Sequence, residues 1–60
     1  MTGEEIRMLR KDLGNWSQKK LASTLGVARY TVNRWEAGIR KPLPIFDKML
    51  TELKDGKYEL

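Results

Sequence analysis

The stretch Ser17–Gly38, SQKKLASTLGVARYTVNRWEAG, decides the fold of this 60-residue chain. Ser17 is a residue type that caps helix N-termini, and the hydrophobic Trp16 before it is placed to pack on Leu21. The apolar residues that continue one helical face are Leu21, Ala22 and Leu25. Gly26 ends this helix, because glycine adopts the positive φ of a helix C-terminus without the penalty that a Cβ brings. The first part of the stretch therefore predicts a short helix between Ser17 and Gly26.

The second part of the stretch predicts another helix directly after Val27. Val27 and Val32 have the spacing of a hydrophobic staple, and Trp35 lies three residues further along the same face. Ala28 occupies the N-cap position, where it offers no side-chain acceptor to the free N–H groups of the first turn. Gly38 closes the helix. The whole stretch thus predicts two short helices joined by a tight glycine turn.

Helices are also predicted on both sides of this pair. Thr2 and Glu5 have the spacing of a capping box, in which each side chain accepts a hydrogen bond from a backbone N–H at the helix start. The apolar residues that follow at helical spacing are Ile6, Leu9 and Leu13. They predict a helix from about Gly3 to Leu13. Pro44 suits the first turn of a last helix that runs towards Gly56. The apolar stripe of this last helix consists of Phe46, Met49, Leu50 and Leu53.

These patterns predict an all-α fold, a compact bundle of four to five short helices around the central pair. No strand pattern, internal repeat or low-complexity segment competes with this interpretation. Met8 is a further core candidate, beside Phe46 and Met49. We expect residues 1–56 to form one domain and residues 57–60 to be a tail that frays, because chain ends are held by few contacts.

The composition excludes several classes of function. The chain has no cysteine and no histidine, so disulfides, the usual zinc ligands and a general-base imidazole are absent. We predict neither a cofactor nor a metal site. The longest apolar runs are a few residues, which is too short for a membrane span, and the N-terminus lacks the apolar segment of a signal peptide. We therefore expect a cytoplasmic protein without contact to a membrane.

The positive charge of the chain is concentrated in its centre. The formal net charge is +4. The segment from Ser17 to Lys41 contains several basic residues and a single acidic residue, Glu36. These basic residues are Lys19, Lys20, Arg29, Arg34, Arg40 and Lys41. The segments on either side are balanced or slightly acidic. A basic stripe along a pair of helices is typical of a surface that binds the phosphates of double-stranded DNA.

The central stretch resembles the Cro-type, lambda-repressor-like helix-turn-helix family, also called the XRE family. The pattern of that family, Gln-x-x-Leu-Ala, Leu-Gly-Val and Val-x-x-Trp-Glu-x-Gly, is present here as QKKLA, LGV and VNRWEAG. The opening TGEEIRMLRK also resembles the DNA-binding domain of the MqsA-type antitoxins. Two features depart from the family pattern. The loop Gly14–Ser17 is one residue longer than the usual form, and Ala28 stands where the family more often has serine or another capping residue.

The geometry of such a helix pair sorts the exposed side chains by function. The second helix lies in the major groove with its N-terminal residues towards the base edges, while Val32 and Trp35 face inward. The residues expected to contact bases are Arg29, Tyr30, Asn33 and Arg34. An arginine pairs with guanine O6 and N7, asparagine pairs with adenine N6 and N7, and tyrosine contacts a thymine methyl group or a phosphate. The resemblance places Arg29, Tyr30 and Arg34 at the usual base-reading positions of the family.

A second set of residues is expected to contact the DNA phosphates. Gln18 combines an amide side chain with the N-terminus of a helix, which attracts a phosphate oxygen. The other members of this set are Lys19, Thr31, Arg40 and Lys41. The charged members add an attraction that is independent of DNA sequence and weakens with salt.

The resemblance also implies a structural ion pair. In the family, the glutamate at the position of Glu36 pairs with an arginine of the first helix, which corresponds to Arg10 here. This role favours a structural over a catalytic interpretation of Glu36.

The sequence leaves three function classes to compare. An enzyme is disfavoured because the chain has no histidine or cysteine, no glycine-rich phosphate loop and no carboxylate pair predicted on a concave wall. A protein-binding module, such as an antitoxin that holds a toxin or a domain that uses the amphipathic face of the last helix, remains an alternative with an unknown partner. Its weakness is that it does not explain the charge of the central pair. We expect a transcriptional regulator that represses, bound as a homodimer to double-stranded DNA.

Overall fold

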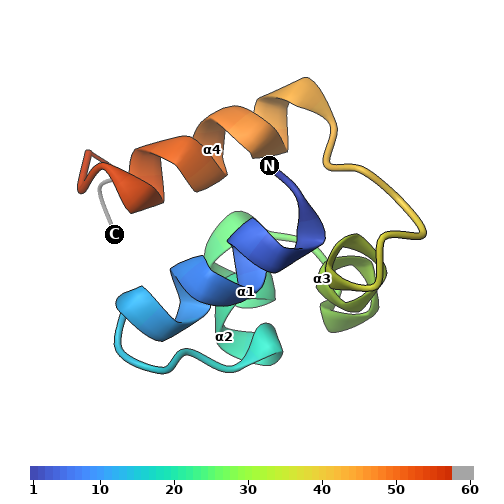
Figure 1. Cartoon of the computed structure of the whole chain (residues 1–60), viewed down its shortest axis with the longest axis horizontal. Coiled ribbons are helices and arrows are strands. Elements are labelled where there is room, and N and C mark those ends of the chain that lie inside the picture. Colours follow the sequence, from blue (N-terminus) through green and yellow to red (C-terminus); the bar gives the residue numbers. More distant parts are fainter. Residues whose placement is uncertain (58–60) are drawn as a thin grey trace.

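The computed structural model describes residues 1–57 and contains four helices within them. Helix α1 comprises Gly3–Asp12, α2 Gln18–Leu25, α3 Arg29–Glu36 and α4 Pro44–Lys54 (Figure 1). The described part of the chain contains no strand, which confirms the predicted all-α fold. Of the predicted tail 57–60, residues 58–60 lie outside the described residues.

Two of the helix starts carry the hydrogen bonds that the sequence predicts. Thr2 Oγ1 accepts a hydrogen bond from the Glu5 backbone N–H at 3.2 Å, and Glu5 Oε1 accepts one from the Thr2 N–H at 2.9 Å. At the start of α2, Ser17 Oγ accepts a hydrogen bond from the Lys20 N–H at 3.0 Å. These bonds satisfy backbone donors that a helix end leaves without an intrahelical partner. Local side chains therefore fix where α1 and α2 begin.

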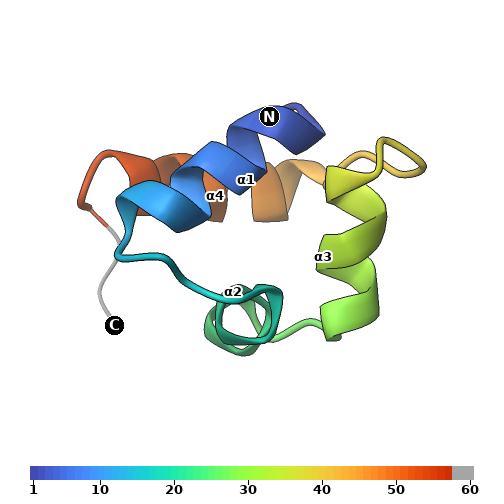
Figure 2. The same cartoon turned by 60° about the horizontal axis from the view of Figure 1, so that its bottom comes forward.

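The turn between α2 and α3 depends on Gly26. This residue has a φ of 77°, and the Val27 N–H donates to the Ala22 carbonyl across it at 2.9 Å. A left-handed residue of this kind is the common way to end a helix and reverse the chain. In Figure 2, α2 is seen nearly along its axis, whereas α3 lies in the plane of the picture and runs from top to bottom. The turn therefore sets the two helices at a steep angle.

All four helices contribute to one hydrophobic core. The buried apolar residues are Ile6, Leu9, Leu21, Ala22, Leu25, Val32, Trp35, Leu50 and Leu53. Trp35 of α3 also packs against Phe46 of α4, with ring centroids 5.7 Å apart at a tilt of 44°. Trp16 is half-buried against the same core. The apolar side of α3 thus packs against the core, and its other side is exposed.

The prediction that Met8 is a core residue is wrong. Its side chain is 53% exposed, whereas Ile6 and Leu9 on the same helix are buried. A helix turns by about 100° per residue, so Met8 lies on nearly the opposite side from Ile6. The other two candidates, Phe46 and Met49, are half-buried and pack against the core.

The start of α1 lies directly against the end of α3. A Cβ added to Gly3 would be 2.5 Å from the carbonyl oxygens of Trp35 and Glu36, and neither backbone atom can rotate away. Glycine is therefore required here by a close approach of two helices rather than by its backbone angles.

We predict that Gly3→Ala destabilises the domain. Alanine is the better helix former by about 0.5 to 1 kcal/mol. Overpacking against backbone atoms costs about 1 to 3 kcal/mol and exceeds that gain. Urea denaturation followed by circular dichroism measures the difference. A midpoint at or above that of the parent would show that α1 and α3 are further apart than described.

We predict that Ala28→Ser stabilises the domain. Ala28 is the N-cap residue of α3, with φ −74° and ψ 149°, and the helix start has no side-chain cap. A serine hydroxyl at such a position contributes about 0.5 to 2 kcal/mol. The reciprocal change Ser17→Ala removes an existing cap and is the matched control, with a loss of similar size. An unchanged unfolding midpoint for Ala28→Ser would mean that α3 begins elsewhere.

Candidate nucleic-acid interface

One side of α3 is exposed and carries the residues predicted to contact bases. Arg29, Tyr30 and Asn33 are exposed, and Arg34 is half-buried. Val32 and Trp35 face the core. The packing of α3 therefore determines which of its side chains are presented outward.

Arg34 and Tyr30 form a stacked pair on this side of α3. The guanidinium carbon of Arg34 lies 4.5 Å from the centroid of the Tyr30 ring. The two residues are one helical turn apart, a separation that brings side chains together on a helix surface. Tyr30 is itself 61% exposed, so the pair stands at the surface.

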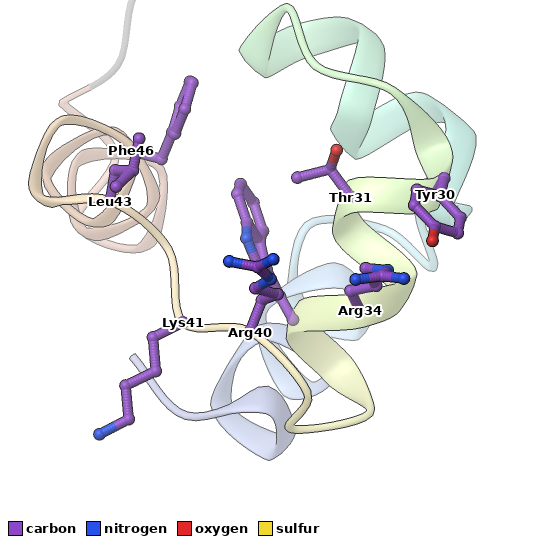
Figure 3. Close-up of a pocket in the computed structure, with 8 residues that line it drawn as sticks. Tyr30, Thr31, Arg34, Arg40, Lys41, Leu43 and Phe46 are labelled. Atoms are coloured by element: carbon purple, nitrogen blue, oxygen red, sulfur yellow. The ribbon is translucent and has the colours of Figure 1, made fainter.

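A hollow of about 300 Å³ separates α3 from the start of α4 and from residues 37–43, which connect the two helices (Figure 3). Its cationic lining residues are Arg34, Arg40 and Lys41, and its apolar lining residues are Trp35, Leu43 and Phe46. Thr31 also lines it. Tyr30 lines it too, so the structure brings three predicted phosphate contacts, Thr31, Arg40 and Lys41, next to two predicted base contacts, Tyr30 and Arg34.

The remaining predicted phosphate contacts lie on α2. Lys19 is exposed and lines a second hollow between α2 and α3, which it shares with Arg29. Gln18 is half-buried, and its Nε2 donates a hydrogen bond to Glu36 Oε1 at 3.3 Å. An amide nitrogen carries two hydrogens, so one remains for another acceptor.

Glu36 forms a buried ion pair with Arg10 beneath this surface. Arg10 Nε donates to Glu36 Oε2 at 2.6 Å and Arg10 Nη2 donates to Glu36 Oε1 at 2.8 Å. The side chain of Glu36 is 3% exposed and that of Arg10 is 19% exposed. Paired hydrogen bonds of this geometry are among the strongest in proteins. They connect α1 to the last residue of α3.

The environment of Glu36 keeps it ionised. Burial by itself raises the pKa of the carboxyl group. The hydrogen bonds from Arg10 and Gln18, with the positive charges of Arg10 and Arg7, outweigh burial and lower the pKa below its ordinary value. The hydrogen bond to Glu36 in turn raises the pKa of Arg10.

Arg10 makes a further contact that the sequence analysis missed. Its Nη1 donates to the Trp16 carbonyl at 2.8 Å, and the Trp16 N–H donates to the Arg10 carbonyl at 2.9 Å. Arg10 therefore holds the loop after α1 at both the N–H and the carbonyl group of Trp16. The local sequence gives no signal for this contact, whereas the one-turn spacing of Tyr30 and Arg34 does indicate their stacking.

The three acidic side chains of α1 line a hollow between α1 and α4. They are Glu4, Glu5 and Asp12, and they share this hollow with Met8 and Lys54. Glu5 also lines a hollow that contains Arg40 and Lys41. None of these acidic side chains lines the hollows beside α3 that contain Arg29 and Arg34. The surface around Arg29 and Arg34 thus keeps its positive charge.

Within residues 1–57, each helix is too short or too polar to span a membrane.

We predict that Glu36→Gln lowers the stability of the fold. Removing one partner of a buried pair costs about 3 to 5 kcal/mol, and the partial exposure of Arg10 favours the lower end. Arg7 is the matched control, because its Nε lies 3.6 Å from Glu36 Oε1 but its side chain is 60% exposed. Arg7→Gln should cost at most about 1 kcal/mol. If Glu36→Gln unfolds at the parent's midpoint, the ion pair does not support the fold.

The same pair predicts a dependence of stability on pH. The folded-state pKa of Glu36 is lowered from 4.5, so its contribution is fully present above pH 4.5 and is lost as the pH falls through the folded-state pKa. The unfolding midpoint of the parent should therefore decrease as the pH is lowered below 4.5. The decline should be shallower in Glu36→Gln, and parallel curves would contradict the assignment.

A comparison with protein families identifies the chain. The family model described as "Helix-turn-helix" matches residues 6–46, from the middle of α1 through α2 and α3 to the start of α4. The searches of curated proteins and of solved structures found no match. The resemblance to the MqsA-type antitoxins is not confirmed. Because the family model covers more than half of the chain, the protein belongs to the XRE-type, lambda-repressor-like helix-turn-helix family, a family of DNA-binding domains rather than of enzymes.

Proposed function

We propose that the domain reads a specific sequence of double-stranded DNA with α3 in the major groove and that it represses transcription. Membership of the family supports the general role of a DNA-binding regulator. The observation that carries the finer proposal is the division of α3 into a buried side with Val32 and Trp35 and an outer side with Arg29 and Arg34. In helix-turn-helix domains the second helix presents its outer side to base edges.

The outer residues of α3 have the chemistry that base recognition needs. Arg29 and Arg34 each carry a planar fork of donors that matches guanine O6 and N7. Asn33 matches the donor and acceptor of adenine, and Tyr30 can contact a thymine methyl group. Apart from the stacking of Tyr30 and Arg34, these side chains make no hydrogen bond or ion pair within residues 1–57. Their polar groups therefore remain available to DNA.

Phosphate contacts would come from both ends of this surface. On α2, the second amide hydrogen of Gln18 and the ammonium group of Lys19 are free to meet one strand. Thr31, Arg40 and Lys41 line the hollow of Figure 3 and would contact the other strand. Such contacts position the protein without reading sequence, and their strength falls with salt.

Binding as a pair follows from the size of the module. Residues 1–56, which we take as the functional domain, present one short recognition helix. Related modules gain sequence selectivity by presenting two such helices about 34 Å apart on a two-fold symmetric site. We therefore propose a homodimer on DNA, with the protein located in the cytoplasm where DNA is accessible to it.

The alternative functions have less support. The apolar side of α4 was a candidate surface for a protein partner, but Leu50 and Leu53 on this side are buried in the core. A catalytic role would have to do without histidine and cysteine, because the chain contains neither. We propose binding without catalysis and without a cofactor.

We predict that Arg34→Ala and Lys41→Ala weaken DNA binding in different ways. Arg34→Ala should cost about 1 to 3 kcal/mol on the preferred site and relax the preference at one base position. Lys41→Ala should weaken binding to all sequences alike and flatten the salt dependence. The measurement is the Kd of each variant on a site selected from random DNA and on a scrambled duplex, at two salt concentrations.

Arg34→Lys is the matched control for the first variant. It keeps the charge but loses the planar fork, so it should also lose base preference. Equal losses on the selected and the scrambled duplex for Arg34→Ala would assign Arg34 to the phosphates. Absence of binding by the parent at low salt would favour a protein-binding module instead.

A further inference from the structure

We propose that Tyr30 serves recognition through Arg34, as a positioning residue whose ring holds the Arg34 guanidinium in the orientation that reads a base. This inference rests on the proposed function and deepens it. Tyr30 lies at a predicted base-reading position, and its ring contacts the guanidinium group of Arg34. The guanidinium carbon is 4.5 Å from the ring centroid.

Among the described residues, the ring is the only partner of the Arg34 guanidinium group. None of the ion pairs and side-chain hydrogen bonds within residues 1–57 involves the Arg34 guanidinium. Arg10 is the opposite case, because Glu36 and the Trp16 carbonyl occupy its N–H groups. A carboxylate beside Arg34 would orient it but consume its donors. An aromatic ring orients the plane and leaves all five N–H groups free for DNA.

The position of the pair on α3 supports this role. Figure 3 shows Tyr30 and Arg34 one turn apart along α3, with the guanidinium next to the ring. Arg34 is half-buried at the edge of the hollow, while Tyr30 is 61% exposed. A free arginine loses much rotamer freedom when it binds a base, and a stacked one has lost part of it already. Preorganisation of this kind strengthens binding without adding a contact to the ligand.

Arg29 provides an internal comparison. It has the same chemistry and lies on the same helix, but it stacks on no ring within residues 1–57. A change at Tyr30 should therefore alter the base preference that depends on Arg34 and leave the preference that depends on Arg29 unchanged. Global weakening of α3 would alter both.

The test compares Tyr30→Phe, which keeps the ring, with Tyr30→Leu, which removes it. The base position read by Arg34 is first identified as the one where Arg34→Ala loses its preference. Tyr30→Phe should keep the discrimination at that position. Tyr30→Leu should reduce it by about two- to fivefold, the factor of an exposed cation–π contact. In the Arg34→Ala background, Tyr30→Leu should have no further effect there.

Three results would overturn the proposal. Equal losses for Tyr30→Phe and Tyr30→Leu would show that the hydroxyl group contacts DNA directly. An undiminished effect of Tyr30→Leu in the Arg34→Ala background would show that Tyr30 reads a base by itself. Unchanged discrimination in Tyr30→Leu would show that the stack does not matter.

A measurement without DNA separates this proposal from the proposed function. In the NMR spectrum of the free domain, ring-current shielding should move the Arg34 side-chain protons upfield in the parent and in Tyr30→Phe, but not in Tyr30→Leu. If the shift is present and the parent binds no DNA, the proposed function is wrong while the stack is real. If the shift is absent and the parent binds DNA selectively, the positioning role of Tyr30 is wrong and the proposed function stands.

Discussion

The structure depends on a single buried carboxylate. Glu36 ends α3, and its two oxygens accept hydrogen bonds from Arg10 of α1 and Gln18 of α2. An isolated charge at this depth would be expensive, so its partners must stay in place for as long as the domain is folded. Arg10 also holds the Trp16 carbonyl, which fixes the path of the loop into α2. One acidic group therefore sets the relative positions of three helices and of the loop that joins two of them.

This arrangement explains how a helix of two turns can be presented rigidly. An isolated helix of this length is not stable in water, because nucleation costs more than a few hydrogen bonds return. In α3, Val32 and Trp35 supply the hydrophobic anchor, and Phe46 of α4 supports Trp35 from the far side. Gly3 lets α1 approach the carbonyl groups at the end of α3. The outer side of α3 is thus held in place by the residues that pack behind it.

The parts of the fold that the sequence predicts well are those decided by neighbours in the chain. The capping box at Thr2 and Glu5, the cap at Ser17 and the turn at Gly26 involve groups within a few residues of one another. Met8 was misplaced because helical spacing admits more than one apolar face, and only the position of α1 on the other helices decides between them. The Gln18 and Trp16 contacts were missed for the same reason, since they form only after α1, α2 and α3 have docked. The Tyr30–Arg34 stack has a local signal in its one-turn spacing, but the sequence pattern predicts a separate DNA contact for each residue.

The separation between the two sides of α3 has a consequence for how such a domain changes over evolutionary time. Arg29 and Asn33 project from the fold without bonding to it, so under the proposed function mutations there would exchange one target sequence for another at little risk to folding. Tyr30 and Arg34 are different, because each is part of the other's surroundings. Drift at these two sites should be correlated, and a lineage that abandons the arginine has little reason to retain the aromatic ring.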